Sequence, residues 1–318
     1  MITGNACFDF LNEKTKEKDR ASSSFWDLYH TNFEYEDGQL SGLQMLGDYQ
    51  ELKLQVSFSD RVIQAIKNIL EIPYRKMAYN KSIFKQLDKT AQNIAAISGQ
   101  RYSLDRLRHT LTLDLLKKYI PGKLMKDSKV CIIGDGFATM ASLFLKSQSA
   151  GQVFIINLNK SLLVDLYFIK KIMPSSDFEK YVCLVTDKDS LLEAIGSKKK
   201  VVAIMANHYE LLQYCPVDVA INIASMQEMD MSIIEKYFYY LRTIATEKEI
   251  FFYCNNREIK VLPDGSVIRF SEFPWSVNDD ILVDELCPWH QKYYSLTPPF
   301  YHKFDGSVRH RLVRLSPE

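Results

Sequence analysis

Residues 129–145 read KVCIIGDGFATMASLFL, an apolar run that passes through two glycines into a second apolar run. The first run is typical of a buried β-strand, and the second predicts a helix. Gly134 and Gly136 allow a sharp turn and let a ligand approach the backbone, beside the free amides of a helix N-terminus. The stretch predicts the first strand–turn–helix unit of a nucleotide-binding α/β fold, with a tight turn that binds nothing as the alternative.

The sequence after this unit repeats the alternation of strand and helix. Helical patterns over 138–146, 161–173, 190–195 and 231–246 separate most of the predicted strands. Apolar strands that alternate with helices predict a mostly parallel sheet covered on both faces. A turn signal also predicts a hairpin over Val261–Phe270. The predicted strands are Lys129–Ile133, Gln152–Asn157, Tyr181–Val185, Val201–Met205, Val217–Ile223, Ile250–Cys254 and Val308–Leu315.

The residues before Pro121 show helical periodicity without a series of strands. Amphipathic helices are predicted from Asp60 to Pro73, over 81–97 and over 104–120. Pro73 is expected to end or kink the first of them. We therefore predict a helical N-terminal region over 1–120, acting as a lid or a dimerisation element, and a Rossmann-like domain over 121–318.

Composition excludes several classes of partner. The 318 residues include 40 Lys and Arg against 39 Asp and Glu, a net charge of +1, which gives no electrostatic reason to expect nucleic acid. No signal peptide and no apolar run long enough to span a membrane is evident. The six cysteines form no CxxC pair, so we expect reduced thiols in a cytoplasmic protein rather than disulfides or a zinc site.

The glycine turn departs from the dinucleotide fingerprint. Thr139 stands where that fingerprint has its third glycine or alanine, and Asn157 stands where the second strand would end in an acidic residue. A nucleotide-dependent oxidoreductase is therefore the weaker interpretation.

Two segments resemble a known family. The stretch 129–145 resembles the first motif of class I S-adenosylmethionine-dependent methyltransferases. Residues 217–229, VDVAINIASMQEM, resemble the end of the fourth strand in the sugar O-methyltransferase family, and FFYCNNR at 251–257 is similar as well. The resemblance covers roughly Lys129 to Arg257, and it implies S-adenosylmethionine as the cofactor and methyl transfer to a hydroxyl of a sugar or glycan.

The resemblance also assigns cofactor-binding residues. The glycine turn is expected to lie under the methionine part of the cofactor, and Asn157 to face the ribose. With Val201–Met205 as the third strand of the sheet, Asn207 and His208 follow at its ligand-binding edge. With Tyr181–Val185 instead, Asp187 takes that place. The predicted cofactor contacts are Gly134, Asp135, Gly136, Phe137, Asn157, Leu158, Asn207, Asn222, Ala224 and Ser225.

A base near the acceptor hydroxyl is the remaining requirement. Glu228 and His208 are the candidates; the alternatives are a helix first-turn carboxylate for Glu228 and a loop cap for His208. Gln227, Arg257 and Trp275 are predicted to bind the substrate; the alternatives are hydrogen bonds to the loop backbone for Gln227, a surface charge for Arg257 and packing between domains for Trp275. The aromatic and imidazole groups that either line an acceptor pocket or pack between domains are Trp26, Tyr29, His30, Trp275, Trp289 and His290.

No metal site is expected, because Asp284, Glu285, His290 and His302 follow no known ligand spacing. We therefore expect an S-adenosylmethionine-dependent O-methyltransferase, with a small-molecule acceptor. A catalytically silent protein that binds the cofactor or acts as a scaffold is the rival interpretation, because Asn157 lacks the carboxylate's charge-assisted hydrogen bond.

Overall fold

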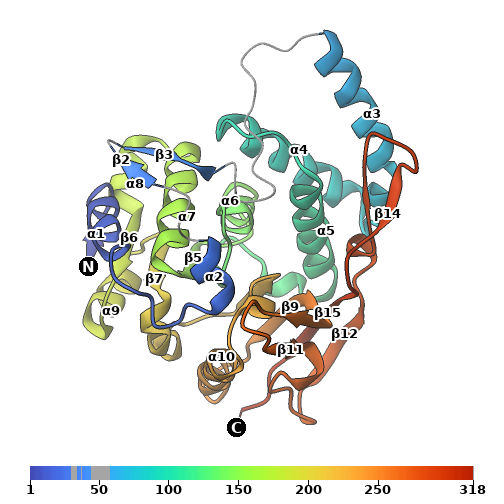
Figure 1. Ribbon diagram of the computed structural model, residues 1–318. Helices are drawn as coiled ribbons and strands as arrows, with labels where there is room; N and C mark the ends of the chain where they lie inside the picture. Colours follow the sequence, from blue (N-terminus) through green and yellow to red (C-terminus); the bar gives the residue numbers. More distant parts are fainter. Residues whose placement is uncertain (30–33, 37, 44–57, 318) are drawn as a thin grey trace.

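A computed structural model describes residues 1–29, 34–36, 38–43 and 58–317 of the chain. A nine-stranded sheet in the order β1-β6-β7-β5-β4-β8-β9-β15-β12 runs through its centre (Figure 1). The strands are β1 (Ile2–Thr3), β4 (Lys129–Ile133), β5 (Gln152–Asn157), β6 (Val182–Val185), β7 (Val201–Met205), β8 (Val219–Ile223), β9 (Phe251–Arg257), β12 (Asp280–Leu286) and β15 (Val308–Arg314).

Six neighbouring strands of this sheet, from β6 to β9, are parallel. The strand order reverses at β4, which lies between β5 and β8, and ligands of open α/β sheets bind at such a switch point. The strand β15 runs antiparallel between β9 and β12, and β1 is antiparallel to β6 at the far edge. The architecture confirms the predicted Rossmann-like fold, a mostly parallel sheet with flanking helices.

Apolar residues cover both faces of the sheet, because the strands are apolar at successive positions and successive side chains point to opposite faces. Ile132 belongs to the core on one face and Ile133 to the core on the other. Helices α1 (Ala6–Lys14), α4 (Lys81–Ile97), α5 (Leu104–Tyr119), α6 (Thr139–Lys146) and α7 (Asn159–Ile172) contribute to the first core. Helices α9 (Lys188–Gly196) and α10 (Met231–Ala245), with the 3₁₀ segment η4 (Ala206–Tyr214), contribute to the second.

Smaller elements surround these three layers. Helix α3 (Phe58–Arg75) projects from the molecule beside the hairpin of β13 (Lys292–Tyr294) and β14 (Tyr301–Lys303) (Figure 1). The hydroxyl of Tyr301 donates to the carbonyl of Leu70 at 2.9 Å, which fastens this hairpin to α3. The others are α2 (Ser24–Tyr29), α8 (Ser175–Tyr181), and the hairpins β2 (Glu34–Glu36)–β3 (Gln39–Ser41) and β10 (Ile259–Val261)–β11 (Val267–Arg269).

The order of the strands resolves the alternatives left by the sequence. The strand β7 pairs directly with β5, so Val201–Met205 is the third strand as favoured, and β6 lies one position further out. Asp187 then caps α9 by accepting from the amide of Ser190 at 2.8 Å. Pro73 lies inside α3 and does not end it. The N-terminal residues also supply β1 to the sheet, although no strand was predicted there.

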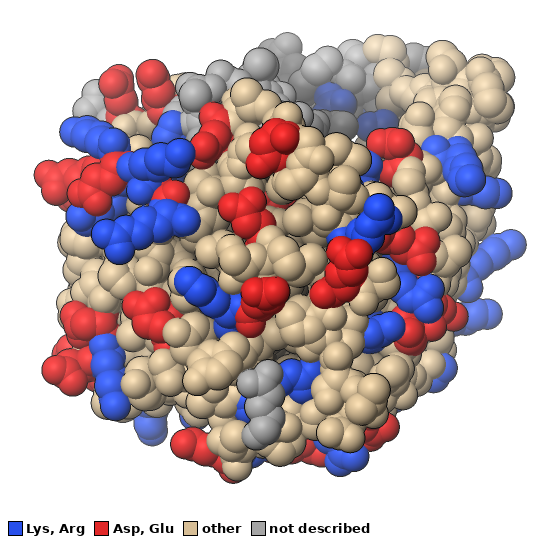
Figure 2. Space-filling model, turned by 60° about the horizontal axis from the view of Figure 1, so that its bottom comes forward, with Lys and Arg blue, Asp and Glu red and all other residues tan. Residues whose placement is uncertain are grey.

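Surface charge and hydropathy add two observations. Among the described residues, no helix has the length and apolarity that crossing a membrane requires. On the face shown in Figure 2, basic and acidic side chains of the described residues are interspersed, and neither sign forms a continuous patch. The six cysteines are free and buried.

Candidate functional site

A cavity of about 840 Å³ opens at the carboxyl ends of the central strands. The turn after β4 lines it with Asp135, Gly136 and Phe137, and the segment after β8 lines it with Ala224, Gln227 and Glu228. The end of β9, the N-terminal half of α5, the β13–β14 hairpin and residues of α2, α3 and α7 also line it. The cavity therefore lies at the switch point of the sheet and joins the C-terminal strands to the N-terminal helices.

The glycine turn is shaped by close packing on one side and open space on the other. Gly134 has φ +73°, and a Cβ there would lie 2.2 Å from Oγ of Ser225. Gly136 has φ +83°, and a Cβ there would meet nothing within 4 Å. Asp135 accepts hydrogen bonds from the amides of Met140 at 2.9 Å and Ala141 at 2.7 Å, so its carboxylate caps α6. Burial raises the pKa of Asp135.

Asn222 braces the ends of three strands rather than facing the cavity. Its Nδ2 donates to the carbonyl of Ile133 at 2.9 Å, and its Oδ1 accepts from Nδ2 of Asn256 at 2.8 Å. Ser225 donates to the same Ile133 carbonyl at 2.9 Å. Both residues therefore hold the glycine turn against β8 and β9, and Asn256 is a member of this brace that the sequence did not single out.

A second, much smaller cleft lies beside the turn. Gly134, Gly136, Asn157, Leu158 and Ser225 line it, and so do Ala21, Trp26 and Ala206. Its volume is about 40 Å³, little more than the space of one water molecule. Five of the predicted cofactor contacts therefore meet here, in a cleft closed by the segment that leads into α2.

Three hydrogen bonds hold this N-terminal segment across the edge of the sheet. Oδ1 of Asn207 accepts from the amides of Arg20 at 2.8 Å and Ala21 at 3.3 Å. The hydroxyl of Ser23 donates to the carbonyl of Glu228. Asn207 was predicted to contact the cofactor, and the structure instead engages its amide oxygen with the chain's own backbone.

The residues present fit S-adenosylmethionine under one condition. The open side of Gly136, the amides of the turn and the large cavity suit the methionine part of the cofactor. Leu158 and Ala206 offer an apolar surface to a purine, but the 40 Å³ cleft between them and Trp26 is too small for one. The purine end therefore fits only if Trp26 and Ala21 give way.

Glu228 is the candidate base that lies on the cavity. It is partly buried, and burial raises its pKa to about 7, against the opposing effects of Lys260, Gln227 and Arg257. Its neighbour Gln227 accepts from the amide of Arg257 at 2.7 Å, which fixes the loop after β8 against β9. A carboxyl with a pKa near neutrality beside a cavity is suited to general base catalysis.

The other sequence-predicted residues divide between the cavity and the core. His208 lies on η4 outside the cavity lining, with Nδ1 3.6 Å from Oε1 of Glu210. Trp275 packs among the aromatic rings beside α10 and donates to the carbonyl of Phe270 at 3.0 Å. Arg257 does line the cavity, and it pairs with Asp305 at 2.9 Å. Gln227 also lines it, so the structure gathers two of the three predicted substrate residues.

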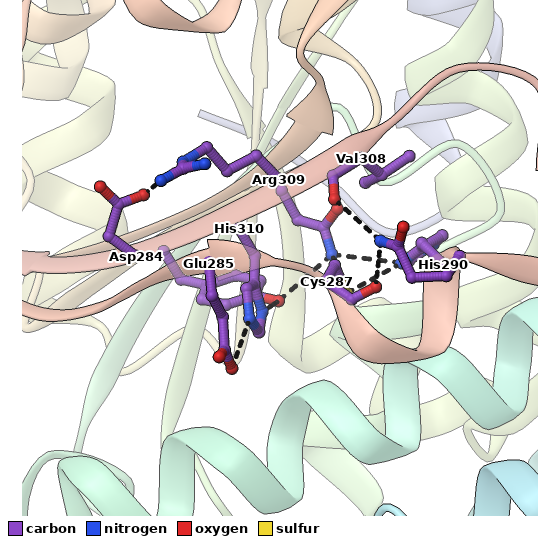
Figure 3. A network of polar contacts seen from close by, with 10 residues as sticks. Asp284, Glu285, Cys287, His290, Val308, Arg309 and His310 are labelled. Carbon is purple, nitrogen blue, oxygen red and sulfur yellow. Dashed lines mark hydrogen bonds and ion pairs between the residues drawn. The ribbon is translucent and has the colours of Figure 1, made fainter.

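Two cavity residues come from α5, to which the sequence assigned no site residue, and a third is His290, one of the imidazole candidates for the acceptor pocket. Arg106 and His109 of α5 line the cavity, as does His290 of the 3₁₀ turn Pro288–His290. Figure 3 shows His290 against Cys287, with Nδ1 3.2 Å from the thiol sulfur. Burial lowers the pKa of His290 well below its usual range. For Arg106 and His109 the sequence did offer a signal, the segment LDRLRH at 104–109, in which charged and imidazole side chains alternate with leucines on a helix that is mostly buried.

The remaining aromatic candidates differ in position. Trp26 lines both the cavity and the cleft, whereas Trp289 is fully buried against His310. The side chain of Tyr29 and all of His30 lie outside the described residues.

The acidic residues once considered for a metal are engaged in ion pairs. Asp284 accepts from Nε of Arg309 at 2.6 Å and from Nη2 of Arg311 at 2.7 Å, and Glu285 lies 3.5 Å from Nε2 of His310 (Figure 3). No group of three His, Cys, Asp or Glu suited to a metal gathers in the described part of the chain.

No protein-family model and no curated protein sequence matches this chain. Its structure is similar to the methyltransferase domain of bacterial CtHen1-CN, at 13% identity and a TM-score of 0.37 over 67% of this chain and 100% of that domain. A Thermoplasma acidophilum protein is 15% identical with a TM-score of 0.37, over 73% of this chain and 97% of that one. The mitomycin 7-O-methyltransferase MmcR is 12% identical with a TM-score of 0.34, over 67% and 57% of the two chains. Likenesses of this size carry no argument about activity, which has to come from the chain's own residues.

Proposed function

We propose that this chain is an S-adenosylmethionine-dependent methyltransferase acting on a hydroxyl group of a sugar or sugar-containing acceptor. The observation that carries the proposal is one cavity that joins the open glycine turn at Gly136 to the carboxyl group of Glu228. The cofactor and the acceptor would then meet within a single space, as an in-line transfer requires.

When bound, the cofactor supplies an activated methyl group on a positively charged sulfur. The acceptor oxygen forms the new bond to the methyl carbon as the carbon–sulfur bond breaks, and the sulfur keeps that electron pair. Glu228 takes the proton of the acceptor hydroxyl, so charge and atoms balance. A base in this position contributes about 10²–10⁴-fold.

The lining of the cavity supports a polyol acceptor. The aromatic residues Phe25, Tyr293 and Phe304 line it, and so do Asn255 and Asn256 at the end of β9. Sugars combine apolar ring faces with many hydroxyls, and sites that mix a few polar groups with aromatic surface suit such ligands. We also propose that α5 forms a wall of the acceptor site, because its N-terminal half lines the cavity.

A cofactor-binding protein without catalysis is the second candidate. The neutral amide of Asn157 at the end of β5 favours it, because this side chain lacks the charge-assisted hydrogen bond of a carboxylate. The two candidates differ in turnover rather than in ligand.

Calorimetric titration of the full chain with S-adenosylhomocysteine tests the cofactor, with NAD as the comparison. We expect binding of the former at micromolar concentrations and none of the latter. A methyl-transfer screen over sugars, sugar phosphates and sugar acids follows. Binding without turnover on any of them supports the silent protein, and NAD binding alone contradicts the proposal.

A further inference from the structure

The cavity wall formed by the N-terminal helices carries several cations. Lys67 of α3, Arg101 before α5, and Arg106 and Arg108 of α5 all line it. These residues face the same space as the glycine turn, so their charge acts on whatever the cavity binds.

Two arginines of α5 differ in how their guanidinium groups are used. Arg108 is engaged throughout: Nε donates to the Trp289 carbonyl at 2.9 Å, Nη1 to Asp105 at 2.7 Å and Nη2 to the Lys292 carbonyl at 2.9 Å. Arg106 is 7% exposed, and the described part of the chain offers its guanidinium no hydrogen bond or ion pair. Arg106 lines the cavity, and its five donors have no protein acceptor among the described residues.

A buried cation without a partner is costly, and the structure provides only weak compensation. Asp135 attracts Arg106 electrostatically, but both of its oxygens accept backbone amides of α6. Burial accordingly lowers the pKa of Arg106 to about 10. A charged guanidinium group that is buried in a cavity wall is suited to bind an oxyanion through two parallel hydrogen bonds.

Lys67 and Arg101 add a second cationic feature to the same wall. Burial lowers the pKa of Lys67, and so does the like charge of Arg101. Glu71 partly offsets this effect, but its carboxylate already accepts from Arg75 at 2.8 Å and from the Tyr294 hydroxyl at 2.8 Å. Lys67 and Arg101 therefore add positive charge to the wall that carries Arg106.

We propose that Arg106, supported by Lys67 and Arg101, forms an oxyanion subsite, so that the acceptor carries a phosphate or carboxylate group. This inference rests on the proposed function only in taking the cavity as the acceptor site. It narrows the acceptor to a negatively charged molecule, such as a sugar phosphate or a sugar acid. The neutral sugars are then poor substrates.

Titration of the full chain with inorganic phosphate and, separately, with acetate tests the subsite at constant ionic strength. We expect phosphate or acetate to bind wild type, and Arg106→Gln to weaken that binding at least tenfold. Arg106→Lys keeps the positive charge but loses the two parallel donors of the guanidinium group, so its anion affinity should lie between those of wild type and Arg106→Gln. Arg314→Gln is the matched control, because it removes one exposed cation far from the cavity and should leave anion binding unchanged.

The cofactor also carries a carboxylate, so the same variants are needed to show whether the subsite binds an anionic group of the acceptor or that of the cofactor. We expect S-adenosylhomocysteine to bind Arg106→Gln within about twofold of wild type. A tenfold loss of S-adenosylhomocysteine binding would assign the oxyanion to the cofactor and overturn the inference, as would no anion binding by wild type. If Arg106→Gln fails to fold, the double variant Lys67→Gln/Arg101→Gln must weaken anion binding instead, or the subsite is rejected. Anion binding that depends on Arg106, without any binding of S-adenosylhomocysteine, would leave the subsite standing and reject methyl transfer.

Discussion

The amide nitrogen of Asn157 donates a hydrogen bond to the buried carboxylate of Asp165, with Nδ2 2.8 Å from Oδ2. The other oxygen of Asp165 accepts from the amide of Ala138 at 2.8 Å. Asp165 therefore ties the end of β5 to the turn that starts α6. Burial and the charge of Asp135 raise the pKa of Asp165 well above its usual range.

This pairing predicts the effect of restoring an acidic residue at 157. Asn157→Asp places two carboxyl groups together in the core and removes a donor, so we expect a loss of about 1–3 kcal/mol in the free energy of unfolding. The exchange Asn157→Asp/Asp165→Asn restores one donor and one acceptor and should recover most of the loss. Urea unfolding at pH 7 measures both. Equal stabilities for the single and the double variant would show that the hydrogen bond contributes nothing.

The raised pKa of Glu228 predicts an ascending pH profile. The carboxylate is the active form of a base, so kcat/KM should rise through about pH 7 and then level off. Glu228→Gln should lower kcat by about 10²–10⁴-fold. His208→Ala is the control, because His208 lies outside the cavity lining, and it should retain wild-type activity. A pH profile unchanged by Glu228→Gln would remove Glu228 from the reaction.

The raised pKa of Glu228 also predicts that the free energy of unfolding falls as the pH rises. The folded state holds the Glu228 proton up to about pH 7, whereas the ordinary value is 4.5. A raised pKa in an acid means that the stability it contributes is lost as pH rises through this window. The stability of Glu228→Gln relative to wild type should therefore increase between pH 4.5 and about pH 7, because Gln does not ionise. Above pH 7 the difference should stay constant. Thermal unfolding at pH 5 and pH 8 measures the difference.

Trp26 predicts an optical signal for the cofactor. The chain has three tryptophans, and Trp275 and Trp289 do not line the cleft. If the purine displaces the Trp26 indole, S-adenosylhomocysteine should change tryptophan fluorescence, and Trp26→Phe should abolish the change. Trp26→Ala should tighten binding by up to about tenfold, which corresponds to about 1.4 kcal/mol. Weaker binding by Trp26→Ala would mean that the indole supports the purine instead of excluding it.

Substitution of the two glycines of the turn should have different effects, a loss of stability at Gly134 and a loss of cofactor affinity at Gly136. Gly134→Ala forces a Cβ against Ser225 in addition to the cost of about 1–2 kcal/mol for a left-handed residue. Gly136→Ala meets no neighbouring atom, so only the backbone cost remains. Chemical unfolding should therefore rank Gly134→Ala as the less stable variant. Gly136→Ala should instead reduce affinity for S-adenosylhomocysteine, since its methyl group projects toward the cavity.

The sequence predicted the central strands well because they are buried on both faces. Val201–Met205 matches β7 at both ends, since an uninterrupted apolar run has one stable position in such a sheet. The strand β12 was missed because DILVDEL is mostly exposed and its charged residues hide the pattern. Edge and near-edge strands carry such charges to discourage pairing with other chains.

The site was harder to predict because its contacts join distant segments. Asn207 follows β7 as expected, yet its partner Arg20 lies 187 residues away, and no local pattern indicates that pairing. Glu228 follows β8 and lines the cavity, and its role as a base stays a prediction. Arg106 escaped notice because an arginine on a helix is usually a surface charge, and only the packing of α5 against the sheet buries it.

The strand β15 lies antiparallel between β9 and β12, so during synthesis β9 is made before the neighbour with which it pairs. About 50 residues separate β9 from β15, and ribosomes add roughly 5–20 residues each second, so β9 waits several seconds for its neighbour. During that interval the growing polypeptide exposes a strand edge next to the ligand-binding end of the sheet. Until residue 314 has been made, β9 lacks the antiparallel neighbour that covers its edge in the folded chain.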